Sequence, residues 1–249
     1  MKRGFYTIMS AQFFSSLADN ALFVAAVELL RTSGAPEWQR AALVPMFALF
    51  YVVLAPFVGA FADALPKGRV MFVSNAIKIV GCLMMLFGSH PLIAYAVAGL
   101  GAAAYSPAKY GILTELLPAS QLVKANGWIE GLTIASIILG VLLGGQLVGH
   151  HLSAALLSID IPMIDFGIHT AAEAAIAALI LVYALAAWFN TRIPHTGVEM
   201  RPLRQHPQRS ILASTLALLP DFWACNSRLW HDKLGQISLS TTTLFWGAG

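Results

Sequence analysis

Six ionisable side chains lie within long apolar stretches of this 249-residue chain, where a charge is costly. On insertion scales, a charged residue near the centre of a membrane helix costs at least about 2.5 kcal/mol. A side chain kept there at that cost indicates either a site for a polar ligand or an ion pair between helices. The six residues are Asp19, Glu28, Lys78, Lys109, Glu130 and Glu173.

Asp19 is the deepest of the acidic residues, near the middle of the first apolar stretch. Ser15 and Ser16 precede it and Asn20 follows, so a polar stripe runs along one part of this segment and suits the wall of a cavity. Two roles fit Asp19: contact with the polar part of a substrate, or an ion pair that joins two helices. Glu28 and Glu173 lie near segment ends, where snorkelling lowers the cost, and we expect structural roles for them.

Lys109 lies in the stretch YSPAKYG, Tyr105 to Gly111, two residues after Pro107. Proline removes a backbone donor and disturbs the preceding turn, which predicts a kinked, partly unwound helix carrying a cation. Transporters bind substrate at broken helices of this kind. Lys109 therefore fits a phosphate group, or an ion pair with Asp19 or Glu130. The two roles are compatible if an arriving substrate breaks the ion pair and Lys109 then binds its phosphate.

The elements that must position these residues are apolar helices. Hydrophobic residues make up 58% of the chain, charged residues only 11%, and the mean hydropathy is +0.72. A soluble domain carries about 25% charged residues. The composition therefore predicts an all-α, polytopic transmembrane helix bundle and excludes a soluble enzyme. Six spans are predicted, at Phe5 to Leu30, Ala41 to Ala62, Val70 to Gly88, Leu92 to Leu113, Ala125 to Val148 and Ile168 to Phe189.

After residue 190 the composition changes. Residues 191–233 are rich in Arg, Pro, His and Gln and predict a basic linker that is either interfacial or partly disordered, with a short surface helix at Ile211 to Leu219. Residues 234–249 are apolar again but make up about half of a span, so we expect the chain to end inside a seventh helix. The domains predicted are residues 1–190, 191–233 and 234–249.

The Lys and Arg residues predict the orientation, because cytoplasmic loops hold the excess of positive charge. With the N-terminus in the cytoplasm, only Arg31 and Arg40 lie on the outer side, and Lys78 and Lys109 lie within spans. The cytoplasmic side then holds the other eleven: Lys2, Arg3, Lys67, Arg69, Lys124, Arg192, Arg201, Arg204, Arg209, Arg228 and Lys233. The positive residues follow this topology, which argues against a nucleic-acid partner.

Glycines repeat at four-residue spacing in the fifth span, Gly127 with Gly131 and Gly140 with Gly144. Such small-residue faces let helices pack backbone to backbone in lipid, so a close helix contact is expected along this span.

Motifs of other function classes are missing from the sequence. We find no nucleophile elbow, no phosphate-binding Gly-Lys-Ser/Thr loop, and no His/Asp pair of an intramembrane acyltransferase. The histidines and the two cysteines have no metal-ligand spacing, so no metal or cofactor is expected. Asp160 and Asp165 form a solvated outer pair, and Tyr183, Trp188 and Trp223 fit aromatic anchoring at the interface.

The turn between the second and third spans reads GAFADALPKGR, from Gly59 to Arg69. Its glycines permit a tight turn, and Asp63 and Arg69 can cap or bridge helix ends. The stretch resembles the loop signature of the major facilitator superfamily, with extra spacing between Asp63 and Gly68. An ordinary turn fits the same residues.

Five short stretches, taken together, are more specific for one family than this turn alone. ADNAL at Ala18, APFVG at Ala55, YSPAKYG at Tyr105, LVKANG at Leu122 and the end LFWGAG at Leu244 occur in this order. They resemble the bacterial lysophospholipid transporter family of the major facilitator superfamily. The resemblance covers nearly the whole chain.

The resemblance implies an inner-membrane transporter of a twelve-helix fold, of which this chain would be the first six-helix half and the start of a seventh helix. It implies that lysophospholipids such as lysophosphatidylethanolamine move inward and are reacylated by a cytoplasmic-face acyltransferase. Another facilitator, such as a drug or metabolite exporter, has the same architecture. Since facilitators bind substrate between halves, we expect this chain alone to insert but to transport little.

On this resemblance, Asp19 meets the head group, and Lys109 meets the phosphate or pairs with Asp19. The residues assigned to substrate binding are Asp19, Asn20, Lys109, Tyr110 and Glu130. The residues assigned to a gating loop are Gly59, Asp63, Lys67, Gly68 and Arg69.

Overall fold

The computed structural model describes residues 3–158, 168–194, 196–198, 200 and 216–248. Every regular element in these ranges is a helix, as the composition predicts. The chain divides into two compact units, residues 1–201 and residues 202–249. We describe each unit by itself.

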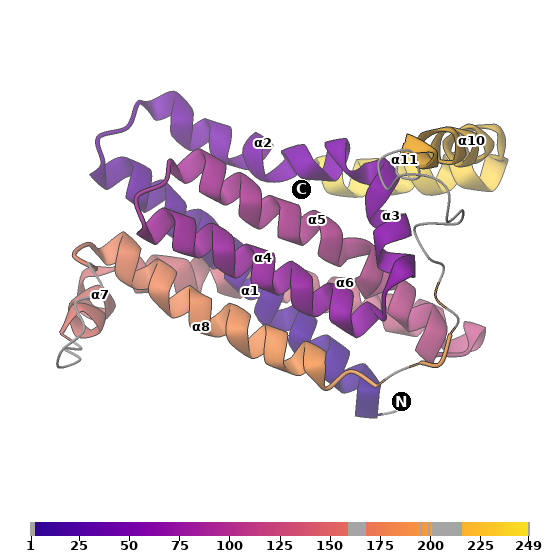
Figure 1. The fold of residues 1–249 in the computed structure, drawn as a ribbon, viewed down its shortest axis with the longest axis horizontal. Helices are drawn as coiled ribbons and strands as arrows, with labels where there is room; N and C mark the ends of the chain where they lie inside the picture. The colour runs from indigo at the N-terminus through magenta and orange to yellow at the C-terminus, as the bar shows by residue number, and fades with distance from the viewer. Residues whose placement is uncertain (1–2, 159–167, 195, 199, 201–215, 249) are drawn as a thin grey trace, which may run out of the picture. The chain divides into compact units, whose positions relative to one another are not determined.

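The first unit is a bundle of long helices (Figure 1). Helix α1 packs against α6 and α8, α4 packs against α5 and α8, and α2 packs along α5. The helices of this unit are α1 (Arg3–Thr32), α2 (Glu37–Val53), α3 (Ala55–Ala64), α4 (Lys67–Leu86), α5 (Pro91–Leu116), α6 (Ala119–Val148), α7 (His150–Leu157) and α8 (Ala171–Thr191).

Four described helices are long and apolar enough to cross a membrane: Gly4–Thr32 of α1, then α4, α6 and α8. Helices α2 and α3 together form a fifth candidate, bent by 65°. Helix α5 has 26 residues and is therefore roughly 39 Å long, more than the hydrocarbon core requires. Its polar residues, which include Lys109, lower its hydropathy. The described helices thus match the predicted segments in order, and the number of six spans stays a prediction.

Two details differ from the sequence-based expectations. The second segment, predicted as one helix, breaks at Leu54 between α2 and α3, where Pro56 occupies the first turn of α3. By contrast, α5 continues across Pro107, so the predicted unwinding at Tyr105 to Gly111 is wrong. Neighbouring helices α2, α3 and α4 pack against α5 and hold this proline-containing turn in helical form.

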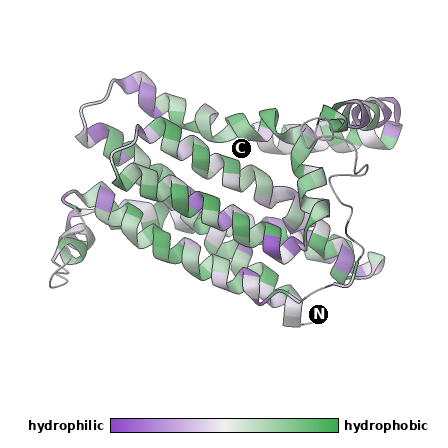
Figure 2. Cartoon of the chain, in the orientation of Figure 1, coloured by the Kyte–Doolittle hydropathy of each residue, from purple (hydrophilic) through white to green (hydrophobic). Residues whose placement is uncertain are grey.

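Figure 2 shows that hydrophobic residues predominate along the long helices, with hydrophilic residues at a few positions. Large apolar side chains such as Val52, Leu142 and Leu181 are 61–76% exposed, while Lys78 is 1% exposed. A soluble protein has the opposite distribution of charge and apolar surface. This distribution fits a protein whose solvent is lipid.

Small residues let the helices approach closely. A Cβ atom built on Gly99 of α5 would lie 2.3 Å from the Phe47 carbonyl oxygen of α2. One built on Gly101 would lie 2.5 Å from the Ser74 carbonyl oxygen of α4. Backbones in direct contact gain dispersion energy where the hydrophobic effect is absent, which is how membrane helices associate.

Of the two glycine pairs on α6, one packs closely against another helix and one does not. A Cβ on Gly140 would lie 2.6 Å from the Leu17 carbonyl oxygen of α1, and one on Gly144 would lie 2.8 Å from Val24 Cβ. Close packing is therefore confirmed for this pair. Gly127 and Gly131 have open space at the same position, so their four-residue spacing does not make a contact within the described residues.

The second unit contains α10 (Leu218–His231) and α11 (Lys233–Ala248) among its described residues. The predicted surface helix, Ile211 to Leu219, overlaps only the start of α10, and its residues 211–215 lie outside the described ranges. Helix α10 lies within the predicted linker, and the surface helix predicted at Ile211 to Leu219 stays a prediction. Helix α11 corresponds to the predicted last apolar run.

We expect the Gly144→Leu substitution to destabilise the first unit, because its side chain would overlap α1. Overpacking of this kind costs about 1–3 kcal/mol. Gly131→Leu is the matched control, since it makes the same change on α6 into open space. Thermal unfolding of the purified chain in detergent measures both. Equal melting temperatures for the two variants would contradict the α1–α6 contact.

Candidate functional site

A polar cluster joins three helices inside the first unit. On α1, Ser15 and Asp19 are four residues apart and share one face. Lys78 of α4 donates from Nζ to Asp19 Oδ2 at 2.7 Å and to Ser15 Oγ at 2.9 Å. Tyr183 of α8 donates its hydroxyl to Asp19 Oδ1 at 2.8 Å. Ser15 in turn donates to Asn75 Oδ1 at 2.7 Å. Both carboxylate oxygens of Asp19 are therefore occupied.

The Lys78 ammonium is enclosed by aromatic rings as well as by oxygens. Its Nζ lies 5.1 Å from the ring centroid of Tyr105 and 5.6 Å from that of Tyr183. Attraction to the ring faces adds to the ion pair where water is excluded. The Asp19 side chain keeps 18% exposure, against 1% for Lys78. A ligand would therefore reach the carboxylate before the ammonium.

Hydrogen-bonding capacity around the cluster is not fully used. Among the described side chains, Asn75 Nδ2, Ser74 Oγ and the Tyr105 hydroxyl are buried with no hydrogen-bond partner. Asn75 is itself in the cluster, and the Tyr105 ring faces Lys78. Since buried polar groups are costly when unpaired, these three can stabilise a polar ligand that enters the cluster.

Lys109, Tyr110 and Glu130 form a second group, on α5 and α6. Lys109 Nζ lies 4.4 Å from the Tyr110 ring centroid, and the Tyr110 hydroxyl donates to Glu130 Oε1 at 2.7 Å. Among the described ion pairs, none joins Lys109 to Asp19 or to Glu130. Of the two roles left open for Lys109, the ion pair with Asp19 or Glu130 is therefore not formed in this structure, and Asp19 is paired with Lys78 instead. Lys109 is buried, with the Tyr110 ring beside its ammonium.

Asn20 does not join the Asp19 cluster. One residue further along α1, it points toward α6, where a Cβ on Gly140 would lie 2.8 Å from Asn20 Cβ. Its side-chain amide donates to the Ser16 carbonyl oxygen of its own helix at 2.8 Å. The structure thus separates Asn20 from the other residues predicted to bind substrate.

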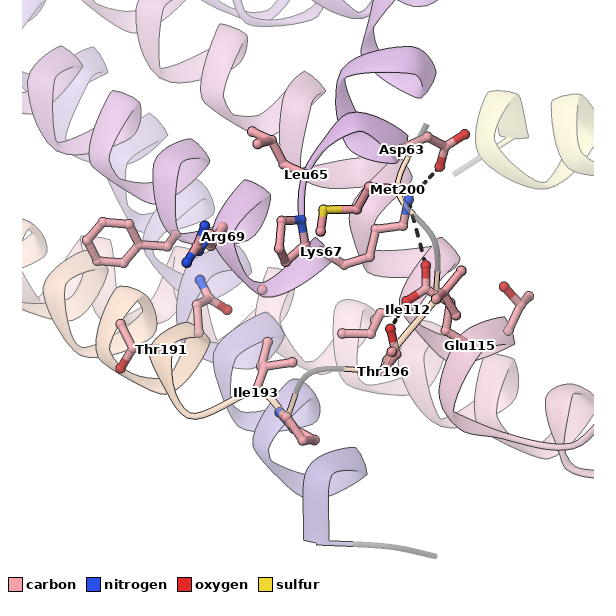
Figure 3. A pocket seen from close by; sticks show the side chains of 18 residues that line it. Asp63, Leu65, Lys67, Arg69, Ile112, Glu115, Thr191, Ile193, Thr196 and Met200 are labelled. Carbon is pink, nitrogen blue, oxygen red and sulfur yellow. Dashed lines mark hydrogen bonds and ion pairs between the residues drawn. The ribbon is translucent and has the colours of Figure 1, made fainter. Parts of the chain in front are cut away.

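The predicted gating loop lies at the α3–α4 turn, where Lys67 is the centre of the contacts (Figure 3). Its ammonium is ion-paired with Asp63, donates to the Ala62 carbonyl oxygen at 2.8 Å, and lies 3.8 Å from Glu115 Oε1 of α5. Thr196 donates to Glu115 Oε2 at 2.6 Å. The ends of α3, α4 and α5 are thereby tied to the segment after α8.

The other residues of this loop take different positions. A Cβ on Gly68 would lie 3.1 Å from the Asn190 carbonyl oxygen, so α4 and α8 need a small residue there. Gly59 faces open space within α3. Arg69 is exposed and points away from Asp63, and the ion pair of Asp63 at this turn is with Lys67 (Figure 3).

A cavity of about 760 Å³ opens beside these residues. Asp63, Lys67, Arg69 and Glu115 line it together with Asn190, whose amide nitrogen and oxygen are both buried without a partner among the described groups. The cavity is therefore charged on one side and has unused hydrogen-bonding capacity on the other.

The remaining ionisable candidates have structural partners. Glu28 is paired with Arg31 one turn along α1, and Glu173 forms a capping box with Thr170 at the start of α8. Asp160 and Asp165 lie outside the described residues. Within the described ranges, no cluster of His, Cys, Asp or Glu has the geometry of a metal site.

From the sequence, Lys78 is identified as an unusual charge but is not assigned to the site, Ser15 is noted only as part of the polar stripe beside Asp19, and Asn75 is missed. The expectation that Tyr183 is an aromatic anchor at the interface is wrong, because Tyr183 is 0% exposed and donates to Asp19 inside the bundle. A signal was present. Ser74, Asn75 and Lys78 form a polar stripe at three- and four-residue spacing on an otherwise apolar segment, as Ser15 and Asp19 do. Two such stripes in lipid are expected to face each other.

Comparison with known proteins gives one family and a set of close relatives. The sequence profile of the Major Facilitator Superfamily matches residues 8–248. A protein of Yersinia enterocolitica named lysophospholipid transporter LplT is 41% identical over 249 residues, which is 100% of this chain and 55% of the relative. The protein of that name in Yersinia pestis strain Pestoides F is 40% identical, over 100% of this chain and 54% of its own. The chain spans about half the length of these curated relatives.

One solved structure has a similar fold. The crystal structure of a bacterial homologue of the human lysosomal transporter Spinster, in an inward-facing and unoccupied conformation, superposes with a TM-score of 0.62. The alignment covers 82% of this chain and 47% of that one, at 20% sequence identity. At this identity the likeness concerns the fold alone.

We expect Asp19→Asn and Lys78→Met each to destabilise the first unit, because each leaves its partner as an unpaired buried charge. Breaking a buried pair costs about 3–5 kcal/mol. The double variant should be much less destabilised than the sum of the two, since no lone charge remains. Thermal unfolding in detergent measures this cycle. Glu28→Gln is the control, because its partner Arg31 is exposed to solvent. Additive effects of Asp19→Asn and Lys78→Met would rule out the coupling.

Proposed function

Because the chain belongs to the major facilitator superfamily, we propose that it is the N-terminal half of a transporter that carries lysophospholipids across the bacterial inner membrane. The observation that carries this proposal is the 41% identity, over every residue of this chain, to a protein named lysophospholipid transporter. Lysophosphatidylethanolamine is the substrate that best matches the charges of the site.

The Asp19–Lys78 pair supports this substrate by its chemistry. The head group of lysophosphatidylethanolamine carries one ammonium and one phosphate, and is thus itself a pair of opposite charges. Its ammonium can replace Lys78 at the partly exposed Asp19 carboxylate, which frees the Lys78 ammonium for the phosphate. The exchange leaves no buried charge unpaired, so the penalty for opening the pair is largely offset.

Lys109 is the second cation proposed for the phosphate. It is buried, none of the described ion pairs includes its ammonium, and its Nζ lies 4.4 Å from the ring centroid of Tyr110. A lysine in this state is a point charge ready for an anion. Tyr110 and Glu130, joined by their hydrogen bond, position the ring beside Lys109.

The Lys67 contacts suit a gate at the other end of the helices. Asp63 and Glu115 hold Lys67 between α3 and α5, and Thr196 ties the segment after α8 to the same group. Facilitators move one half against the other around a central site. Breaking these contacts would let the helix ends separate, so we propose that the Asp63–Lys67–Glu115 group opens when substrate is released.

The location and partners follow from the same proposal. The distribution of Lys and Arg predicts a cytoplasmic N-terminus in the inner membrane. Lysophospholipid brought to the cytoplasmic leaflet becomes available to a cytoplasmic-face acyltransferase, which we propose as the functional partner. Facilitators bind substrate between two six-helix halves, so we propose that transport requires a second half in addition to this one.

Uptake of labelled lysophosphatidylethanolamine tests the function. In spheroplasts without their own carrier, the 249-residue chain alone should insert but give little uptake, because the opposite wall of the site is missing. The chain extended by the second half of a relative should give uptake. Failure of the extended chain, with insertion confirmed, would favour a different facilitator substrate, such as a drug or metabolite.

In the extended chain, Lys109→Gln should weaken binding of lysophosphatidylethanolamine. Loss of one hydrogen bond to a charged group is about 1.5–3 kcal/mol, which is roughly tenfold or more in affinity. Lys124→Gln is the matched control, because Lys124 is exposed at the start of α6. Binding measured by competition against a fluorescent lysolipid should change for Lys109→Gln alone. An equal effect of both variants would remove Lys109 from the proposed site.

A further inference from the structure

Helix α10 carries an aromatic face that nothing in the transport proposal uses. Leu219, Trp223 and Trp230 are separated by four and seven residues, so at about 3.6 residues per turn they lie along one line of the helix. Their side chains are 40%, 71% and 58% exposed. We call these three residues the tryptophan face. The side of α10 away from this face carries Asp221, Ala224 and Arg228, and His231 lies on the flank between the two sides.

A sharp turn of the backbone divides α10 from α11, the next helix in the chain. The backbone of Asp232 is extended, with φ −88° and ψ 128°, and ends α10. Asp232 Oδ2 then accepts from the Gly235 backbone N–H at 3.0 Å, which caps the first turn of α11. Gln236 Nε2 donates to the Trp230 carbonyl oxygen at 2.7 Å. The change of direction between the two helices is therefore built into the chain.

The chain around α10 places it beside a bilayer. It follows α8, a helix apolar enough to span the membrane, and a single residue separates it from α11, whose Leu234, Ile237 and Leu244 are exposed apolar side chains. Where a helix with such side chains enters a bilayer, the corner before it lies at the membrane boundary. Tryptophan is enriched at that level, where its ring is in the acyl boundary and its N–H meets the headgroups.

The net charge around α10 indicates whether electrostatic attraction to lipid headgroups contributes to membrane binding. Between Leu218 and Lys233, Asp221 and Asp232 balance Arg228 and Lys233, so the formal charge is zero with neutral histidine. Attraction to anionic lipid is then a minor contribution, and burial of the apolar side chains supplies the binding energy.

From these observations we propose that α10 lies flat in the headgroup region of the membrane, with the tryptophan face in the lipid and Asp221 and Arg228 toward water. The partner is the phospholipid surface itself, whatever the charge of its headgroups. The helix thereby fixes the height at which α11 enters the bilayer.

The test uses the whole chain in phosphatidylcholine vesicles. Cysteine is placed at Leu219→Cys, on the tryptophan face, or at Ala224→Cys, on the opposite side, in a Cys225→Ser background. The native Cys82 is buried and does not react with the label. A nitroxide is attached, and its collisions are measured with oxygen, which concentrates in lipid, and with a nickel chelate, which stays in water.

We expect the label at position 219 to collide more with oxygen and less with nickel than the label at position 224. Adding anionic phosphatidylglycerol should leave both values unchanged. The double change Trp223→Gln and Trp230→Gln should raise nickel collisions at position 219. Trp38→Gln, at an exposed position in the first unit, should not.

Two results would overturn the proposal. Equal and high nickel collisions at both positions mean that α10 lies in water. Low collisions with both reagents at position 219 mean that the tryptophan face packs against protein. Neither readout depends on transport, so the proposal fails or stands independently of the substrate.

Discussion

The ion pair between Asp19 and Lys78 is the constraint on which the first unit depends. Two opposite charges in a bilayer interior are tolerable only in contact, and this contact requires α1 and α4 to lie at one distance and rotation. The Tyr183 hydroxyl of α8 donates to the second carboxylate oxygen of Asp19, so α8 is held by the same residue. Three helices distant in the chain are therefore oriented by one polar cluster, while apolar packing alone would allow them to rotate.

Small residues make this cluster possible. Ala18, Ala21 and Ala25 of α1 are fully buried, and Gly101 of α5 brings its backbone against the stem of Lys78, where a Cβ would lie 2.8 Å from Lys78 Cγ. Larger side chains would separate the helices beyond the reach of Lys78. The same close packing excludes water and strengthens the pair, so a zwitterionic head group, which brings both charges at once, is better suited to open it than a single ion.

Much of this arrangement could be predicted from the sequence. The order of the helices follows from apolar segments of sufficient length. Asp19 can be identified because a carboxylate within an apolar segment is costly unless it has a polar or charged partner. The identity of the partner could not be predicted, since Lys78 and Lys109 lie in similar surroundings and only the rotation of α4 and α5 distinguishes them. Likewise, Pro56 and Pro107 are both prolines within apolar segments, and tertiary packing decides that the first accompanies a break and the second a continuous helix.

The position of the three partners along the chain has a consequence for biosynthesis. During synthesis α1 emerges with Asp19 first, α4 brings Lys78 after it, and α8 brings Tyr183 last. As it leaves the translocation channel, α4 carries a lysine and an asparagine that lipid disfavours, but Asp19 and Ser15 of α1 are already available to bind them. Insertion of the third predicted span is thereby coupled to retention of the first, and the order of residues in the gene becomes part of the assembly mechanism.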